Sequence, residues 1–175
     1  MSDSVPEQER VFPVNAIHVV RTTQQIHVQL SQMADQKANM LLAATFVIFT
    51  ISIGQARSAT APVPLMILGV SAFFSAVFAI LAVLPMTRYP AGAPTNLLFF
   101  GSFTDLPEQE YLDRLVNQLA HDETAYRLMA RDIYQNGVVL QRKKYRLLGI
   151  AYRIFLIGLT ASFGAFIVQH AHWYL

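Results

Sequence analysis

The sequence predicts an all-α integral membrane protein with three transmembrane helices and a cytoplasmic helical stalk or bundle. Two observations lead to this fold class. The chain is 54% hydrophobic and only 14% charged, whereas charged residues make up about 25% of an ordinary soluble domain. Its apolar residues also gather in three blocks, which are long enough to cross the hydrocarbon core of a bilayer as helices.

The first block defines a predicted span over 38–56. Lys37 and Arg57 bracket 19 residues without a charged side chain, close to the ~20 apolar residues that a ~30 Å hydrocarbon core requires. Before it, 14–37 is predicted as a cytoplasmic helix, because apolar residues recur at steps of three and four. No glycine or proline interrupts these segments before Gly54, so we expect one long helix, partly in water and partly in lipid.

The second and third spans are expected at 63–85 and 147–169. The second lies within the 30 residues that separate Arg57 from Arg88 without any charge. Pro85 ends it, because proline cannot continue the helical hydrogen-bond ladder. The third follows a cluster of basic residues, which suits the edge of a membrane span.

The remaining segments differ in character. Residues 1–13 are expected to be disordered, and they lack the basic and apolar regions of a signal peptide. Residues 87–106 contain prolines and glycines and are expected to form an irregular cytoplasmic segment. From 107 to 146, apolar residues alternate at steps of three and four, which predicts a cytoplasmic helix with a heptad-like seam for a partner helix. An external tail, 170–175, completes the chain, with aromatics that suit a membrane interface.

The charges predict the orientation of the spans. The segments on the expected cytoplasmic side carry 11 Lys and Arg residues, whereas the loop between the first two spans carries only Arg57 and the C-terminus none. This positive-inside bias places the N-terminus in the cytoplasm and the C-terminus in the periplasm. A reporter fused after Leu175 that is active only in the cytoplasm would contradict this orientation.

Several polar residues are candidates for a binding site, each with a plainer alternative. Lys37 either belongs to a charged collar that ends the first span, or points into the bundle and binds an anion. Asp122, Asn136 and Lys143 occupy seam positions. They either fix the register of paired helices or face a pocket, where they suit a ribose hydroxyl, a base edge and a phosphate respectively. Asn96 begins the apolar segment NLLFFG, which is either a pocket wall or lid, or a plug that covers the seam.

No pattern of residues indicates an enzyme. His121 and Asp122 resemble the His-Asp pair of metal phosphohydrolases, but the further ligands of such a site are missing around them. There is no G-x-S-x-G motif, no Gly-rich phosphate loop and no cysteine. We therefore expect no catalytic residue, no metal and no cofactor. A net charge of +2 gives no reason to expect nucleic acid as a partner.

Four groups of residues, in this order and at this spacing, are shared with a known family. They are Ala34-Asp35-Gln36-Lys37-Ala38, Asn96-Leu97-Leu98-Phe99-Phe100-Gly101, Tyr111 with Ile133-Tyr134-Gln135-Asn136, and Lys144-Tyr145-Arg146-Leu147-Leu148. Over roughly residues 14–170 the sequence resembles the transmembrane effector family of Pycsar, the bacterial pyrimidine-cyclase antiphage system.

The resemblance implies a function in antiphage defence. A neighbouring cyclase makes cyclic UMP or cyclic CMP during infection, and the effector senses this nucleotide and impairs the bacterial inner membrane, which leads to abortive infection. The expected partners are then the cyclic nucleotide, the lipid bilayer and further copies of the chain in a homo-oligomer. As a hypothesis, the nucleotide binds among Lys37, Asn96, Tyr111, Asn136 and Lys143. The alternative is a membrane-anchored adaptor or signalling protein without pore activity.

Overall fold

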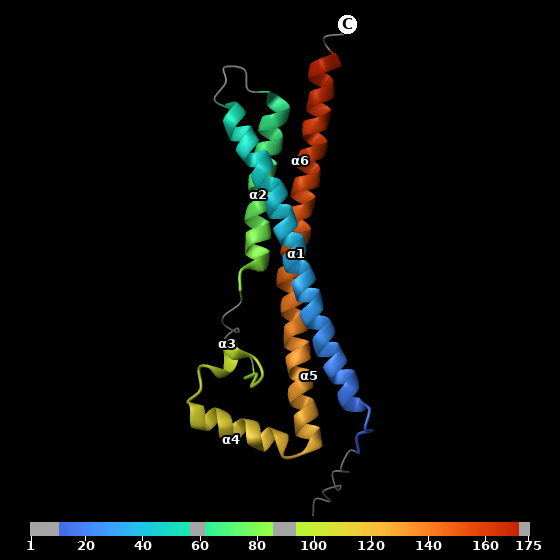
Figure 1. Ribbon diagram of the computed structural model, residues 1–175, viewed down its shortest axis with the longest axis vertical. Helices are drawn as coiled ribbons and strands as arrows, with labels where there is room; N and C mark the ends of the chain where they lie inside the picture. The colour runs from blue at the N-terminus through green and yellow to red at the C-terminus, as the bar shows by residue number, and fades with distance from the viewer. Residues whose placement is uncertain (1–10, 57–61, 86–93, 172–175) are drawn as a thin grey trace, which may run out of the picture. The chain divides into compact units, whose positions relative to one another are not determined.

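The computed structural model describes residues 11–56, 62–85 and 94–171, and this part of the chain is helical with short connections and no strand (Figure 1). The all-α prediction is therefore confirmed for the described residues. The expectations for the extreme N-terminus, the loop after the first span, the start of the irregular segment and the end of the tail lie outside them. These parts are residues 1–10, 57–61, 86–93 and 172–175.

Two compact units divide the chain, and each combines segments that are distant in the sequence. The first unit comprises Met1–His27 and Met86–Gly137, and the second comprises Val28–Pro85 and Val138–Leu175. Helix α1 (Ala16–Ala56) contributes residues to both units, and so does α5 (Asp122–Val139). Each unit therefore depends on long-range packing that local sequence patterns do not specify.

Helix α1 is the single long helix that the sequence predicts. It begins shortly after Pro13, whose carbonyl accepts a hydrogen bond from the Ala16 N–H at 2.8 Å. It continues through both expected segments, because no glycine or proline occurs in it before Gly54. Its 41 residues extend about 60 Å at ~1.5 Å per residue, roughly twice the thickness of a hydrocarbon core. Part of α1 therefore lies outside the hydrocarbon.

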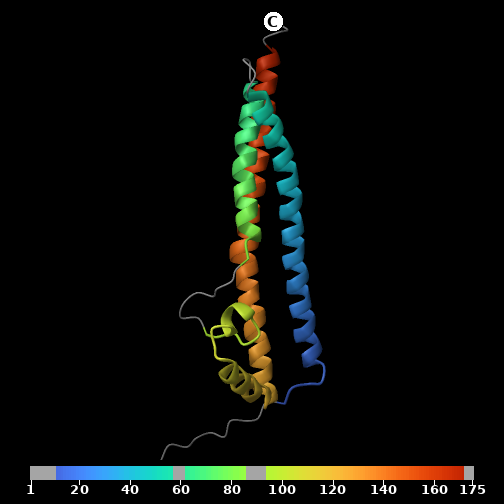
Figure 2. The ribbon, with the colours of Figure 1, turned by 60° about the vertical axis from the view of Figure 1, so that its left-hand side comes forward.

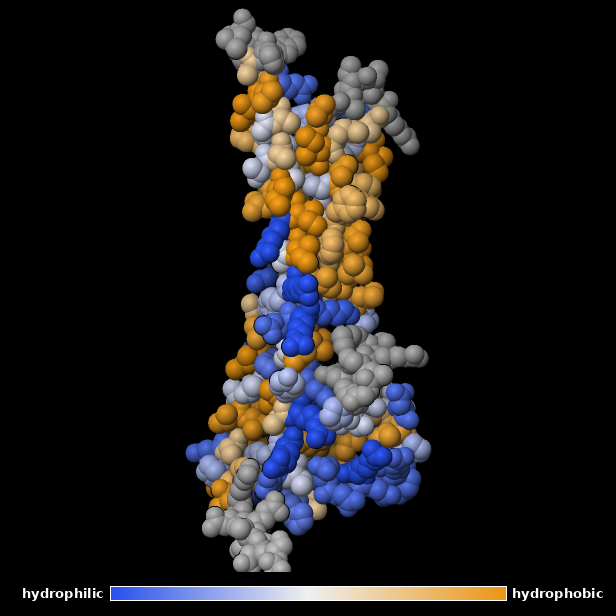
Figure 3. All heavy atoms as spheres, turned by 180° about the vertical axis from the view of Figure 1, so that it is seen from behind, coloured by the Kyte–Doolittle hydropathy of each residue, from blue (hydrophilic) through white to orange (hydrophobic). Residues whose placement is uncertain are grey.

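Among the described residues, three helical runs are long and apolar enough to cross a membrane. They are Ala16–Ala56, Val63–Val83 (α2) and Asp122–Ala171, which ends in α6 (Arg146–Ala171). Large hydrophobic side chains cover the outer surface of these helices in the second unit (Figure 3). The protein is therefore a multi-pass membrane protein.

Small side chains form the contacts between the helices of the second unit. Helices α2 and α6 lie side by side (Figures 1 and 2), and residues 28–56 of α1 pack against both. The buried contact residues are Ala34, Ala38 and Leu41 of α1, Ala79 and Ala82 of α2, and Leu148 and Ala151 of α6. Small residues let helix backbones approach closely, which is how helices associate in lipid without a hydrophobic driving force.

Serine hydroxyls add hydrogen bonds between these helices. Ser75 Oγ of α2 donates to the Ala151 carbonyl of α6 at 2.9 Å, and Ser162 Oγ of α6 donates to the Pro64 carbonyl of α2 at 2.7 Å. Each hydroxyl therefore has an acceptor where no water is available to provide one. The two bonds fix the register of α2 against α6 along the length of the pair.

A π-helical stretch, η1 (Leu140–Tyr145), joins α5 to α6 without interrupting the helix. Two neighbouring lysines of η1 reach different helices. Lys143 Nζ donates to the carbonyl of Leu84 at the C-terminal end of α2 at 2.9 Å, where a helix leaves its last carbonyls unpaired. Lys144 Nζ lies 2.7 Å from both carboxylate oxygens of Asp35 on α1. The π-helical turn thus ties α1 and α2 to α6.

Breaking the ion pair between Asp35 and Lys144 should weaken the packing of α1 in the second unit. Lys144 Nζ also donates to Ser31 Oγ at 2.8 Å, and the lysine and aspartate side chains are 19% and 38% exposed. Because the pair is partly solvated, we expect a coupling energy of about 1 kcal/mol. A double-mutant cycle with Asp35→Asn and Lys144→Met, followed by thermal unfolding in detergent, measures it. The pair Glu110–Arg114, whose side chains are 41% and 51% exposed, serves as the control, with less than ~0.5 kcal/mol expected; equal coupling in both cycles would contradict the prediction.

The helix predicted over 107–146 is interrupted. Helix α4 (Glu108–Leu119) ends before Ala120, and α5 begins at Asp122. Thr124 Oγ1 donates to the carbonyl of His121 at 2.9 Å, and two acidic residues occupy the first turn of α5. Negative side chains are favourable at a helix N-terminus, because unpaired N–H groups give that end a partial positive charge. These features start a new helix even though the apolar period continues.

The buried face of α5 differs from the predicted seam. Its buried residues are Leu128, Asp132 and Gln135, whereas Asp122 and Asn136, which the seam included, are exposed. The predicted seam continues the spacing of α4 into α5 as if the helix were unbroken. The break between the two helices changes which face of α5 points inward. Helix α5 therefore presents a buried carboxylate and a buried amide to the rest of the first unit.

The segment predicted as irregular over 87–106 contains one helical turn, α3 (Phe100–Phe103), after non-helical residues 94–99. Asn96 and Leu97 of the non-helical part are buried. The ring of Phe103 packs against the ring of Tyr111 on α4, with centroids 4.7 Å apart. Part of the NLLFFG segment is therefore buried in the first unit, whereas Leu98 and Phe100 are 41% and 56% exposed.

Candidate functional site

A buried carboxylate stands at the centre of a polar network in the first unit. Asp132 of α5 is 8% exposed, and Asn96 of the non-helical segment is 1% exposed. Asp132 Oδ1 accepts a hydrogen bond from Asn96 Nδ2 at 3.0 Å, and Asp132 Oδ2 accepts one from Gln24 Nε2 of α1 at 3.1 Å. One carboxylate therefore joins three segments that lie far apart in the sequence.

Asn96 also shapes the backbone around itself. Its Oδ1 accepts from the Leu98 N–H at 2.9 Å, and its own N–H donates to Ser102 Oγ at 2.9 Å. Side-chain oxygens of asparagine that bond the backbone two residues later hold a tight turn. The oxygen and the nitrogen of the Asn96 side chain both take part in these contacts, so the residue holds the segment in place.

Helix α5 holds the neighbouring backbone through two further side chains. Gln135 Nε2 donates to the Pro94 carbonyl at 3.2 Å, and Arg131 Nη1 donates to the Thr95 carbonyl at 3.4 Å. Together with the bond from Asn96 to Asp132, these contacts fasten residues 94–96 along one side of α5. The segment is thereby fixed as a wall of the first unit.

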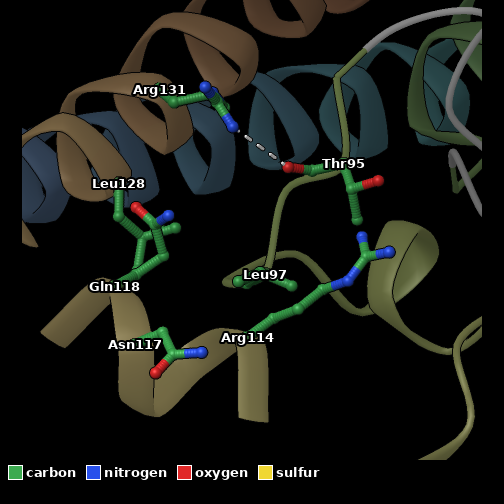
Figure 4. Close-up of a pocket in the computed structure, with 7 residues that line it drawn as sticks. All are labelled: Thr95, Leu97, Arg114, Asn117, Gln118, Leu128 and Arg131. Atoms are coloured by element: carbon green, nitrogen blue, oxygen red, sulfur yellow. Dashed lines mark hydrogen bonds between the residues drawn. The ribbon is translucent and has the colours of Figure 1, made fainter. Parts of the chain in front are cut away.

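Beside this wall lies an open cavity of about 370 Å³ (Figure 4). The non-helical segment contributes Thr95 and Leu97, and the other lining residues come from α4 and α5. The latter are Arg114, Asn117 and Gln118 of α4 with Leu128 and Arg131 of α5. Two guanidinium groups, two amides and two leucines thus face one space, whose lining contains no acidic residue.

The two arginines of the cavity differ in their surroundings. Arg114 forms an ion pair with Glu110 one turn earlier on α4, and its side chain is 51% exposed. Arg131 is exposed, and its hydrogen bond in this structure goes to a neutral backbone carbonyl, that of Thr95. The positive charge of Arg131 is therefore the less compensated of the two.

The residues of the nucleotide-site hypothesis fall into both units. Asn96, Tyr111 and Asn136 belong to the first unit, and Lys37 and Lys143 belong to the second. Of the first three, Asn96 is buried between two residues that line the cavity, Tyr111 is half-buried, and Asn136 is exposed. In the second unit Lys37 is exposed, while Lys143 is half-buried and bonded to α2. Their joint role in binding stays a prediction.

The sequence does not indicate the hydrogen-bond partners that place Asn96 in the buried network. Gln24 and Asp132 carry no motif, and their pairing joins positions 108 residues apart. Arg114 and Arg131 were counted only as charges that set the orientation of the spans. The exposure of Asn136 and the burial of Asp132 follow from the break before α5, which the acidic first turn of that helix was able to indicate.

The described residues contain no group of three or more His, Cys, Asp or Glu side chains that could hold a metal ion. His121 and Asp122 lie at the start of α5, and both are exposed. Within the part of the chain that the structure describes, the pair therefore has no converging ligands of the kind that a metal phosphohydrolase requires. Its role in this structure is to begin a helix.

The domain model of the Pycsar effector protein matches residues 18–169, nearly the whole chain. The chain belongs to the Pycsar effector family. Comparisons with curated proteins and with solved structures found no match. Membership in this family, together with three membrane-spanning helices, supports a role as a Pycsar antiphage effector in a membrane. The Pycsar effector domain is not a known enzyme family.

Proposed function

We propose that this Pycsar effector is activated by a cyclic pyrimidine nucleotide, cyclic UMP or cyclic CMP, and then impairs the bacterial inner membrane. Infected cells would stop growing or die before the phage matures. The observation that supports this most strongly is the division of one chain into the second unit, which contains the membrane spans, and the first unit, which contains the polar network and the open cavity. Such a division would allow one polypeptide to hold both a sensor and a membrane effector.

Two helical runs provide the covalent connection between sensing and membrane activity. Residues 16–27 of α1 and 122–137 of α5 belong to the first unit, and both helices continue into the second. A ligand shifts a conformational equilibrium only by its differential affinity for the two states. A ligand whose contacts around the cavity favour one packing of α1 and α5 would therefore also change the packing of the spans into which these helices continue.

Membrane damage by this mechanism requires several copies of the chain. Apart from Arg153, the apolar blocks at 38–56, 63–83 and 147–169 contain no charged residue. Polar and charged side chains inside a span are what usually line an ion pathway. One subunit is therefore unsuited to form an aqueous pore, and we propose a homo-oligomer that either forms a channel or breaches the bilayer.

The proposed orientation places the first unit in the cytoplasm, where a cyclase would release its product. It follows the positive-inside bias of the sequence, with the C-terminus in the periplasm. The nucleotide acts as a ligand in this proposal, and the effector performs no chemistry on it.

Producing the effector in bacteria together with a uridylate or cytidylate cyclase tests the proposed function. We expect uptake of propidium iodide and arrested growth only when effector and an active cyclase are both present. An effector that localises to the membrane but leaves permeability unchanged with either cyclase would contradict the proposal and favour the adaptor alternative.

A further inference from the structure

We propose that the cavity between α4, α5 and residues 95–97 is the nucleotide site of the effector, with Arg131 and Arg114 as its phosphate-binding residues. This inference rests on the proposed activation by a cyclic nucleotide and adds the place and the chemistry of binding. The cavity is lined by two arginines, two side-chain amides, a threonine and two leucines, and no acidic residue is among them.

The charge of the cavity suits a phosphate ester. A guanidinium group carries five N–H donors in a planar fork, a geometry that matches phosphate oxygens. Arg131 uses one donor on the carbonyl of Thr95, at 3.4 Å, which leaves the rest of the fork for a ligand. Arg114 is partly compensated by Glu110, so we assign the larger share of phosphate binding to Arg131.

The remaining lining residues suit a base and a sugar. Asn117 and Gln118 each offer a carbonyl acceptor and an amino donor. The edge of a uracil or cytosine also carries both donors and acceptors, so it can pair with such an amide. Leu97 and Leu128 are 6% and 4% exposed, so they form an apolar floor of the cavity that presents only a small area to a ligand. In the view of Figure 4, the two amides and the Arg114 guanidinium lie on opposite sides of Leu97.

The size of the cavity is sufficient for a small ligand. Small-molecule pockets measure about 300–1,000 Å³, and this one, at about 370 Å³, lies near the lower end. It therefore has room for a single nucleotide with one anionic phosphate group. The class of ligand is a cyclic mononucleotide, in agreement with the proposed activator.

The site is in direct contact with the buried network. Thr95 and Leu97 flank Asn96 in the chain, and Arg131 precedes Asp132. A ligand that draws Arg131 away from the Thr95 carbonyl would therefore act on the wall that Asn96 and Asp132 hold together. Binding and the positions of α1 and α5 are thereby linked through the network.

Equilibrium dialysis of radiolabelled cyclic UMP and cyclic CMP against the purified full chain in detergent tests the site. We expect Arg131→Gln to weaken binding at least tenfold, Arg114→Gln about three- to tenfold, and Arg131→Lys to lie between Arg131→Gln and the unchanged protein. Arg127→Gln is the matched control, one turn from Arg131 on the same helix and paired with Glu123, and should change binding less than twofold.

The outcomes separate the site from the proposed function. If the unchanged protein binds a cyclic pyrimidine nucleotide and a variant with both Arg114→Gln and Arg131→Gln binds equally well, the site is wrong and the proposed function stands. If the unchanged, folded protein binds neither nucleotide, both are wrong. Loss of binding in Arg114→Gln, whose side chain lies outside the buried network, would support the site even if Arg131→Gln fails to fold.

Discussion

Replacing Asp132 with alanine should abolish the response to nucleotide while leaving the protein in the membrane. The carboxylate is the acceptor for Asn96 Nδ2 and Gln24 Nε2; its removal leaves the buried Asn96 amide without this partner, and the half-buried Gln24 amide loses it as well. An unsatisfied buried donor costs about 1–3 kcal/mol, so we expect a loss of about 1–3 kcal/mol in the stability of the first unit. Hydrogen exchange of the α5 amides, compared with that of the α6 amides, measures this loss.

The conservative replacement Asp132→Asn should give an intermediate result, because Asn96 and Gln24 bond to different oxygens of Asp132 and the replacement turns one of these oxygens into an NH2 group that cannot accept. Asp113→Ala is the control on α4, since Asp113 is exposed and accepts from Gln109 at 3.2 Å at the surface. It should leave hydrogen exchange and nucleotide-triggered dye release unchanged. If the α5 amides of Asp132→Ala exchange hydrogen as slowly as those of the unchanged protein, the claim that the network stabilises the first unit is contradicted.

Replacing Gly158 with valine should disrupt the membrane-spanning unit. A Cβ at this position of α6 would collide with the Oγ and Cβ of Ser71 on α2, and the Cβ of a serine cannot move without its helix. Overpacking of this kind costs typically 1–3 kcal/mol, and we expect about 3 kcal/mol here, since α2 and α6 would have to separate. The midpoint of thermal unfolding in detergent, followed by circular dichroism, measures the effect.

Gly164→Val is the matched control for this substitution. Gly164 lies on the same helix, and a Cβ there would meet nothing within 4 Å. The two variants have the same composition and the same change in helix propensity, so a difference between them reports the close approach of α2 and α6. Equal unfolding midpoints would show that this close approach does not occur in the protein.

The helical nature of the chain and its apolar spans were predictable, because membrane-spanning segments are determined by local composition. A run such as 38–56 without a charge must pair its own backbone groups in lipid, and a helix achieves this within the segment. The end of the second span was also predictable from a local signal, because Pro85 follows α2, which ends at Val83. The family, too, was predictable, from short segments spread along the chain.

The candidate site was not predictable in the same way, because its contacts join distant segments. Nothing near Asn96 in the sequence indicates Asp132, 36 residues later, as its partner. The phase of α5 was wrong because the apolar period runs through Ala120 and His121, although the chain turns there. Periodicity detects a helical face, but it does not detect a break that preserves the period.

Dye release from liposomes tests sensing and membrane activity together. The purified chain is inserted into vesicles loaded with carboxyfluorescein, and cyclic UMP, CMP, AMP and GMP are added in turn. We expect release with a cyclic pyrimidine nucleotide and none with the two purine nucleotides. No release with any of the four, from protein shown to be folded and inserted, would contradict a self-contained sensor and membrane effector and favour a membrane-anchored adaptor.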